Sequence, residues 1–566
     1  MMLLVPVLTT WISIEHRRLV QLLPNKVREL WNNWELRGLV LISLLSQIIL
    51  TILGKHRKSG TNILIRVLVW SSYLTADLVA TAGLGVISSS MTGDGGEDID
   101  HQLIAFWAPF LLVHLGGPDT ITAYALEDNE LWSRHLQSRS SERQGIFEKL
   151  SPVKAFKAVE NELGYAYDIF YTKASVIYTH WGFISRLFTS IVLALVFLIT
   201  ILKIQKHDLS KMDRNITYIL VVGAVLIETI SFCFLLWSEW TVSWLERNPA
   251  SWFPSSLLSC FQTREKWSNR LAQFNLLDFC ILSKNKSAEG TYFQKLLKLE
   301  NNIYITQKEF LDDLKVRIFA HFKKTRIDGN INNVTYLLGH KRYASSNPFN
   351  ASDRDSDEAN RNVSFILMLT SYAEFHERIL IWHIATDICF YVVDVDSHRK
   401  VYAQASKILS DYMLYLLVKR RYMFPVGSGL IKFRDTCAEI REVLVKRKSI
   451  TGVDEASRKL LRINTDIPRS RAKGDKSRSV LFDAIRLAKA LCGLQEDMWE
   501  LVTEVWVEIL SYAATHCRVD NHAQQLRRGG EFLTIYGSFL LILVPWNSFK
   551  YGQRTMSEFL LISFRA

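Results

Sequence analysis

The chain has 566 residues, 49% of them hydrophobic and 22% charged, and its mean hydropathy is +0.07. Apolar membrane helices joined to a charged soluble region would give this average. The formal net charge of +12 fits either nucleic-acid binding or the basic cytoplasmic segments of a membrane protein. Because no nucleic-acid-binding motif accompanies the charge, we expect a lipid bilayer as partner and no nucleic acid.

The cysteine content bears on the compartment. The seven cysteines are dispersed, odd in number and include no CxxC pair. This pattern disfavours a disulfide framework or a zinc ribbon and fits a reducing compartment.

Apolar runs in the first 245 residues predict a membrane domain with about five transmembrane helices. The third run is short and contains Pro109, so the count is four if that run does not span the bilayer. The five expected spans cover residues 34–53, 63–87, 103–115, 184–202 and 216–237.

Three ionisable side chains fall within or beside these runs: Asp77, His114 and Glu228. A charged group inside a membrane is costly, so each is a candidate for ion or proton handling. The alternative for Asp77 is a buried carboxyl group that is hydrogen-bonded to Thr or Ser.

The stretch GGPDTITAYALEDNELW, residues 116–132, follows the third run. Gly-Gly-Pro ends a helix, and Asp119 or Thr120 could then cap a new one. The stretch holds an acidic motif of Asp119, Glu127, Asp128 and Glu130. With His114 and His135 it could form a metal or proton site at the membrane surface, or it could be the solvated face of an interfacial helix.

The charges of the segments between the expected spans predict which side of the membrane each segment faces. Residues 93–102 contain no Lys or Arg, whereas residues 133–183 contain several. The positive-inside rule places the second segment, and with five spans everything from residue 246 onward, in the cytoplasm. The basic residues before the first span favour the opposite orientation.

The rest of the chain predicts a mainly α-helical fold. We expect short helices over residues 246–344, including one at 307–324, and a polar linker at 345–362. A helical C-terminal domain is expected over residues 363–534, followed by a tail at 535–566.

Two features of the C-terminal part could bind ligands. His376, His383 and Asp387 are spaced to share one helical face, which could be one side of a metal site or a polar stripe. A basic tract could contact anionic lipid or serve as a solvated linker. Its members include Lys446, Arg447, Lys448, Arg469, Arg471 and Lys473.

The stretch at 116–132 resembles a plant membrane-protein family, domain of unknown function 4220. The blocks WHIATDICFY, LSDYMLYLLVKRRYMFP, FRDTCAEI, VWVEILSYAATHC and HAQQLRRGGEFLT resemble its frequent C-terminal companion, domain of unknown function 594. The resemblance implies no activity, cofactor or catalytic residue. After Thr534 the sequence departs from the family pattern, which puts the packing of the C-terminal end in question.

Phosphate-binding loops, dinucleotide fingerprints, nucleophile elbows and kinase motifs are all missing from the sequence. We therefore expect a non-enzymatic scaffold or signalling protein that binds protein partners through its C-terminal domain. The first alternative is a transporter or channel that uses Asp77, Glu228 and His114. The second is a membrane enzyme with a metal at His376, His383 and Asp387.

Overall fold

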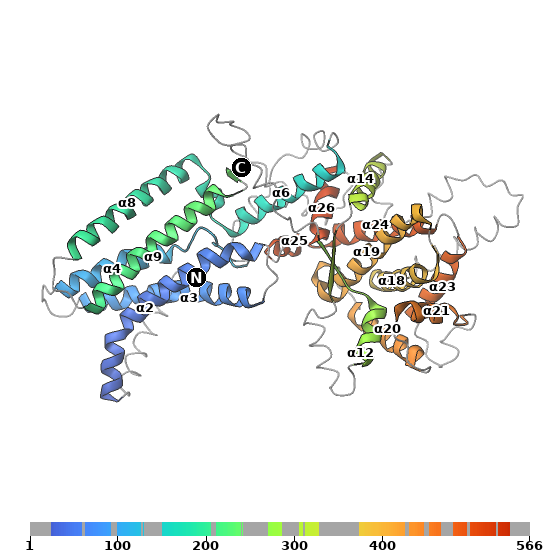
Figure 1. The fold of residues 1–566 in the computed structure, drawn as a ribbon, viewed down its shortest axis with the longest axis horizontal. Coiled ribbons are helices and arrows are strands. Elements are labelled where there is room, and N and C mark those ends of the chain that lie inside the picture. Colours follow the sequence, from blue (N-terminus) through green and yellow to red (C-terminus); the bar gives the residue numbers. More distant parts are fainter. Residues whose placement is uncertain are drawn as a thin grey trace, which may run out of the picture.

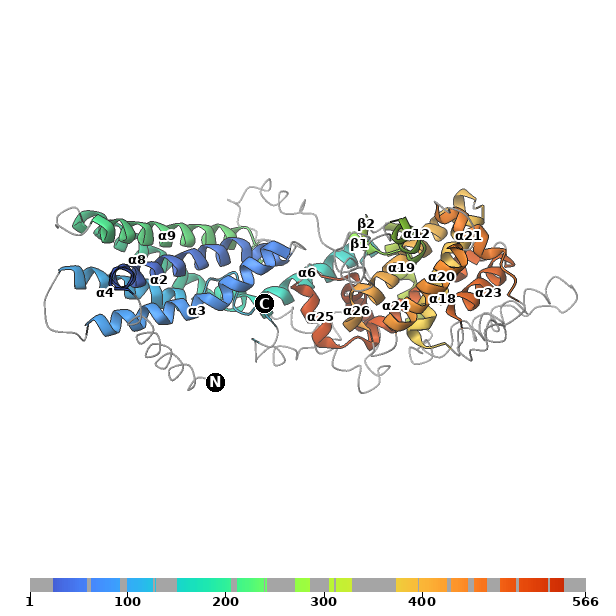
Figure 2. The same ribbon diagram turned by 90° about the horizontal axis from the view of Figure 1, so that it is seen from below.

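A computed structural model describes most of the chain as helices. The described residues are 24–58, 63–91, 99–125, 128, 150–204, 211–238, 240–241, 270–285, 305–309, 312–327, 373–394, 396–424, 429–445, 452–465, 479–494, 498–527 and 530–543. Figures 1 and 2 show two helical units at opposite ends of an elongated molecule.

The first unit, here called the membrane bundle, contains five helices. They are α2 (Asn25–Gly54), α3 (Ile63–Met91), α4 (Ile99–Leu115), α8 (His180–Ile204) and α9 (Lys211–Leu236). Four of them, all except α4, are long and apolar enough to cross a membrane. Many of their large apolar side chains, such as Leu195 and Ile199 of α8, face outward, as a lipid environment favours.

The third apolar run forms the helix α4, which continues through Pro109. Its 17 residues extend about 25 Å, less than the roughly 30 Å of a bilayer core. The helix still returns the chain to the end of the bundle where α2 terminates, because Gln47 of α2 donates to the carbonyl of His114. The chain therefore passes along the bundle five times, and four of the passes have membrane-spanning length.

The second unit is built around α18 (Phe375–Val392), whose residues 376 and 379–389 are buried. The surrounding helices are α19 (Ser397–Lys419), α20 (Gly429–Val445), α21 (Val453–Leu461), α23 (Val480–Cys492), α24 (Met498–His516), α25 (Val519–Leu526) and α26 (Phe532–Leu543). A short 3-10 helix, η5 (Arg421–Met423), follows α19. We call this assembly the C-terminal unit.

The core of the C-terminal unit also recruits earlier segments of the chain. The helix α6 (Pro152–Tyr171) packs on α26, with the Phe156 and Phe539 rings 4.3 Å apart. It precedes the short helix α7 (Ala174–Ile177), which leads into α8. The core thus reaches into the range that the sequence assigned to the membrane domain.

The connecting region 246–344 is not wholly helical. The strand β1 (Arg270–Gln273) pairs antiparallel with β2 (Thr306–Glu309). The helices α12 (Leu276–Asn285) and α14 (Asp312–Ile327) follow these strands. The helix expected at 307–324 was therefore wrong at its start, because residues 307–309 pair with β1.

The expected tail begins inside a helix. Ile535, Tyr536 and Phe539 of α26 are completely buried in the C-terminal core. The departure from the family pattern after Thr534 therefore leaves apolar packing intact through α26, while residues 544–566 lie outside the described part of the chain.

Candidate functional site

Residues 116–125, here called the junction segment, lie between the two units. Gly117 has a φ of +66°, a left-handed conformation that glycine adopts without strain and that commonly ends a helix. The Lys173 ammonium donates to the carbonyls of Gly116 and Gly117 at 2.8 and 2.7 Å. A cation at these carbonyls stabilises the C-terminal end of α4.

The expected helix at Asp119 or Thr120 does not form, since described residues 116–125 adopt turns and bends. The Thr120 hydroxyl donates to the Leu50 carbonyl of α2 at 2.7 Å instead of capping a helix. Tertiary partners thus replace the local cap that the sequence pattern predicted.

The Tyr124 carbonyl receives one guanidinium from each side of the junction. Arg57, in the 3-10 helix η1 (Lys55–Lys58) at the end of α2, donates to the Tyr124 carbonyl and lies 4.3 Å from the ring centroid. Arg527, just after α25 of the C-terminal unit, donates to the same oxygen at 2.8 Å. One arginine from each unit therefore donates a hydrogen bond to the same backbone carbonyl, that of Tyr124.

Two further hydrogen bonds tie the junction segment to the C-terminal unit. The Thr122 amide donates to the Tyr171 carbonyl at 2.9 Å. The buried Tyr171 hydroxyl in turn donates to the Ala523 carbonyl of α25 at 3.2 Å. The last residue of α6 therefore bridges the junction segment and α25.

The predicted acidic motif does not assemble as a cluster in the described residues. Asp119 forms an ion pair with Arg186 of α8 at 2.5 Å. Asp128 accepts from the Tyr124 and Ala125 amides, both at 2.9 Å, and so holds a local turn. Glu127, Glu130 and His135 lie outside the described residues.

The three predicted intramembrane groups have different surroundings. Glu228 pairs with Arg186 at 3.1 Å and accepts from the Ser190 hydroxyl at 2.7 Å. His114 is buried, with its Nδ1 atom 2.9 Å from the Ser43 hydroxyl. Asp77 lies on the exposed face of α3. Within the described residues, these groups do not form one connected set.

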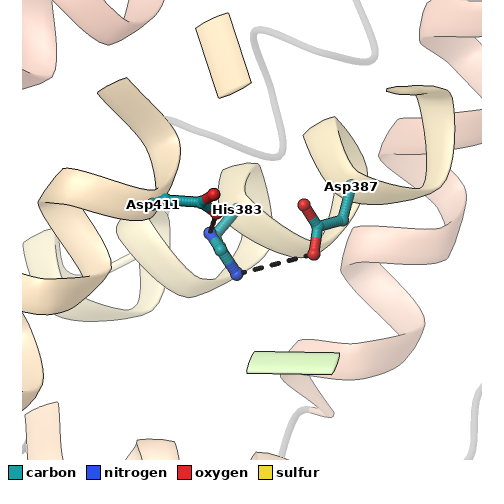
Figure 3. A group of neighbouring side chains, drawn as sticks. All are labelled: His383, Asp387 and Asp411. Atoms are coloured by element: carbon teal, nitrogen blue, oxygen red, sulfur yellow. Dashed lines mark ion pairs between the residues drawn. The ribbon is translucent and has the colours of Figure 1, made fainter. Parts of the chain in front are cut away.

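The C-terminal unit contains a buried polar cluster, shown in part in Figure 3. His383 and Asp387 lie one turn apart on α18, and Asp411 comes from α19. His383 Nε2 is 3.8 Å from Asp387 Oδ2, and His383 Nδ1 is 3.9 Å from Asp411 Oδ1. These donor atoms are close enough together to consider a metal ion.

Lys407 of α19 already supplies the positive charge of this cluster. Its ammonium lies 2.6 Å from an oxygen of Asp387 and 2.6 Å from one of Asp411. Burial opposes the charged form of Lys407, but the two carboxylates outweigh burial and raise its pKa. Despite burial, Lys407 also lowers the pKa of Asp387.

Both nitrogens of His383 are engaged. The Leu276 amide donates to Nε2 at 3.2 Å, so Nδ1 carries the proton and donates to the Ser410 hydroxyl at 2.8 Å. Burial lowers the pKa of His383, which keeps the ring neutral. A metal ion would have to displace Lys407 and the Leu276 amide, so the donor set fits a structural cluster better than a metal centre.

The third predicted metal candidate, His376, is absent from this cluster. Its ring lies beside Gly429 and near Phe424. The sequence interpretation missed three members of the cluster: Lys407, Asp411 and Asn275. The side-chain amide of Asn275 donates to an Asp387 carboxylate oxygen at 2.6 Å. The i,i+4 spacing of Lys407 and Asp411 was a usable signal, whereas nothing local marked Asn275.

Six members of the predicted lipid-contact tract lie outside the described residues: Lys446, Arg447, Lys448, Arg469, Arg471 and Lys473.

Comparison with protein families gives two matches. Domain of unknown function (DUF4220) matches residues 70–140 and 136–280. Protein of unknown function, DUF594, matches residues 493–537, so the proposed blocks before residue 493 lie outside that match. No curated protein and no solved structure gives a significant match to the chain. The chain thus carries a DUF4220 region followed by a DUF594 region, as its sequence resemblance predicted. The contacts between the two regions include the bond from Arg527 to the Tyr124 carbonyl and the bond from Tyr171 to the Ala523 carbonyl.

Proposed function

We propose that this protein is a non-enzymatic membrane scaffold that presents its C-terminal unit as a binding module in a fixed orientation. The observation that carries this proposal is the double hydrogen bond at the Tyr124 carbonyl, which joins Arg57 of the bundle to Arg527 of the C-terminal unit. A connection through several side chains limits rotation between the units, which a flexible tether would permit.

The polar groups in the bundle support the same proposal over the transporter alternative. Arg186 neutralises both Asp119 and Glu228, so these carboxylates already hold a resident cation. A transported cation would have to compete with that guanidinium. His114 contacts Ser43 instead, and Asp77 lies on the exposed face of α3. Neither side chain therefore joins Asp119 and Glu228 as a further ligand for a cation.

The scaffold and transporter proposals can be separated in proteoliposomes. We expect purified full-length protein to show the same cation and proton flux as empty liposomes. We also expect reciprocal co-purification with a recurring set of proteins from native membranes. A flux that Glu228→Gln abolishes, while Ser190→Ala retains it and both variants keep the wild-type melting temperature, would overturn the scaffold proposal.

For orientation, we propose that the C-terminal unit faces the cytoplasm, as the basic content of residues 133–183 predicts. The acceptor sequences for N-glycosylation at Asn285, Asn333, Asn350 and Asn362 provide the test. We expect no glycosidase-sensitive shift and protease access from the cytosol. Glycans at these sites would place the unit on the opposite side of the membrane.

A further inference from the structure

Two cysteines that are far apart in the sequence come together in the C-terminal unit. Cys389 lies on α18 and Cys492 is the last residue of α23, and their sulfur atoms are 3.8 Å apart. The two helices pack along each other in the core. A disulfide bond requires a sulfur separation of about 2.05 Å, so side-chain rotation must bring the two atoms closer by roughly 1.8 Å.

The two thiols differ in accessibility. Cys389 is completely buried, whereas Cys492 is partly exposed at the end of its helix. Reversible oxidation sites in proteins commonly pair an accessible thiol, which reacts first, with a neighbouring thiol that resolves the product. The positions of Cys492 and Cys389 correspond to these two roles.

We propose that Cys389 and Cys492 form a peroxide-sensitive oxidation site, in which a reversible disulfide bond joins α18 to α23. The site is independent of the proposed scaffold function. It is also compatible with the reducing compartment that the dispersed cysteines predict, because disulfide bonds in such compartments are transient and commonly redox-sensing.

The reaction has two balanced steps with hydrogen peroxide as the oxidant. The Cys492 thiolate attacks one peroxide oxygen, the O–O bond breaks, and the sulfur becomes a sulfenic acid while hydroxide takes up the thiol proton and leaves as water. The Cys389 sulfur then attacks the Cys492 sulfur, and the sulfenic oxygen leaves with the Cys389 proton as a second water. Two thiols are oxidised by two electrons, and one peroxide is reduced to two waters.

The electrostatic environment is consistent with this order. The hydrogen bond between the sulfurs lowers the pKa of Cys492 against the opposing effect of burial. The same hydrogen bond, together with burial, raises the pKa of Cys389. The exposed member of the pair is therefore the better thiolate, although its place at the C-terminal end of α23 works against a negative charge.

A second cysteine pair offers an internal control. Cys280 of α12 and Cys437 of α20 interact through their side chains, but both are buried. Burial also raises the pKa of Cys437. Close approach without an accessible thiol should leave this pair reduced under conditions that oxidise Cys389 and Cys492.

The test is peroxide treatment of the folded full-length protein, followed by alkylation, digestion and mass spectrometry. We expect a peptide crosslinked through Cys389 and Cys492, its loss after dithiothreitol, and unmodified thiols at Cys280 and Cys437. In Cys389→Ser, dimedone should trap a sulfenic acid at Cys492, whereas Cys437→Ser should leave the crosslink yield unchanged. Absence of the crosslinked peptide from peroxide-treated wild-type protein, or equal oxidation of the Cys280 and Cys437 pair, would overturn the proposal.

Discussion

The membrane bundle and the C-terminal unit use similar helices in opposite ways. On α8 the large apolar side chains point outward, and the polar side chain of Arg186 turns inward to bind Asp119 and Glu228. On α18 the apolar side chains point into the core, and even His383 and Asp387 are completely buried. Apolar surface therefore lies outside on α8 and inside on α18, while Arg186 in the bundle and Lys407 in the C-terminal unit each pair with carboxylates.

The comparison also concerns how charge is neutralised. In the C-terminal unit, one lysine serves two buried carboxylates on neighbouring helices. In the bundle, one arginine serves two carboxylates from the junction segment and α9. Each cation joins separate segments of the chain, so its removal should affect packing as well as charge.

The largest effect is expected for Lys407→Met. The substitution leaves Asp387 and Asp411 buried without their cation, and loss of one partner from a buried ion pair costs about 3–5 kcal/mol. Thermal unfolding of the full-length protein should show a clearly lower melting temperature. Lys459→Met, which breaks the exposed pair with Glu455, is the control and should cost at most about 1 kcal/mol. Equal losses of unfolding free energy in Lys407→Met and Lys459→Met would show that burial of the cluster does not increase the cost of removing its cation.

A smaller loss is expected in the bundle for Arg186→Met. Asp119 and Glu228 are about four-fifths buried, with 23% and 20% of their side chains exposed. Loss of the charged hydrogen bonds should cost about 2–3 kcal/mol, measured as thermal unfolding in lipid nanodiscs. Ser190→Ala removes only a neutral partner of Glu228 and should cost about 1 kcal/mol. The same loss in both variants would contradict a stabilising role for the cation.

Acid should weaken the C-terminal unit through His522. Burial lowers its pKa to about 4, and the ring contacts the Thr534 hydroxyl and the Ala514 carbonyl. The unfolded chain binds the proton near pH 6.5, so this contribution is complete above that pH and is lost as the pH falls toward 4. Its loss between pH 7.5 and 5 should be about 2 kcal/mol.

Melting temperatures of wild type and His522→Leu over this pH range isolate that contribution. The variant should start less stable but lose less stability on acidification. Parallel pH profiles would show that His522 does not titrate between its folded and unfolded environments in this way.

The smallest loss of stability, about 1.5 kcal/mol, is expected for Arg527→Ala, which removes one charged hydrogen bond at the junction. Its distinctive effect should be orientational. Distances between spin labels on α3 and α24 should become more broadly distributed, because Arg57 alone would then hold the Tyr124 carbonyl. Arg518→Ala, which breaks an exposed pair with Asp520, is the matched control and should leave the distribution unchanged. Identical distance distributions in wild type, Arg527→Ala and Arg518→Ala would show that the Arg527 bond does not fix the orientation of the two units, and would contradict the scaffold proposal.

The sequence by itself determined the helical class, the apolar runs and the order of the two family regions. These properties depend on composition and local periodicity, which are readable without long-range contacts. The spacing of His383 and Asp387 also correctly placed both side chains together on one helix.

Only the tertiary structure decided which charges meet. It paired Lys407 with both buried aspartates and left His376 elsewhere. It also replaced the expected cap at Thr120 with a bond to Leu50, and brought Arg527 to Tyr124 across 403 positions of sequence. Such contacts depend on how helices pack in three dimensions, and local propensity contains no record of that packing.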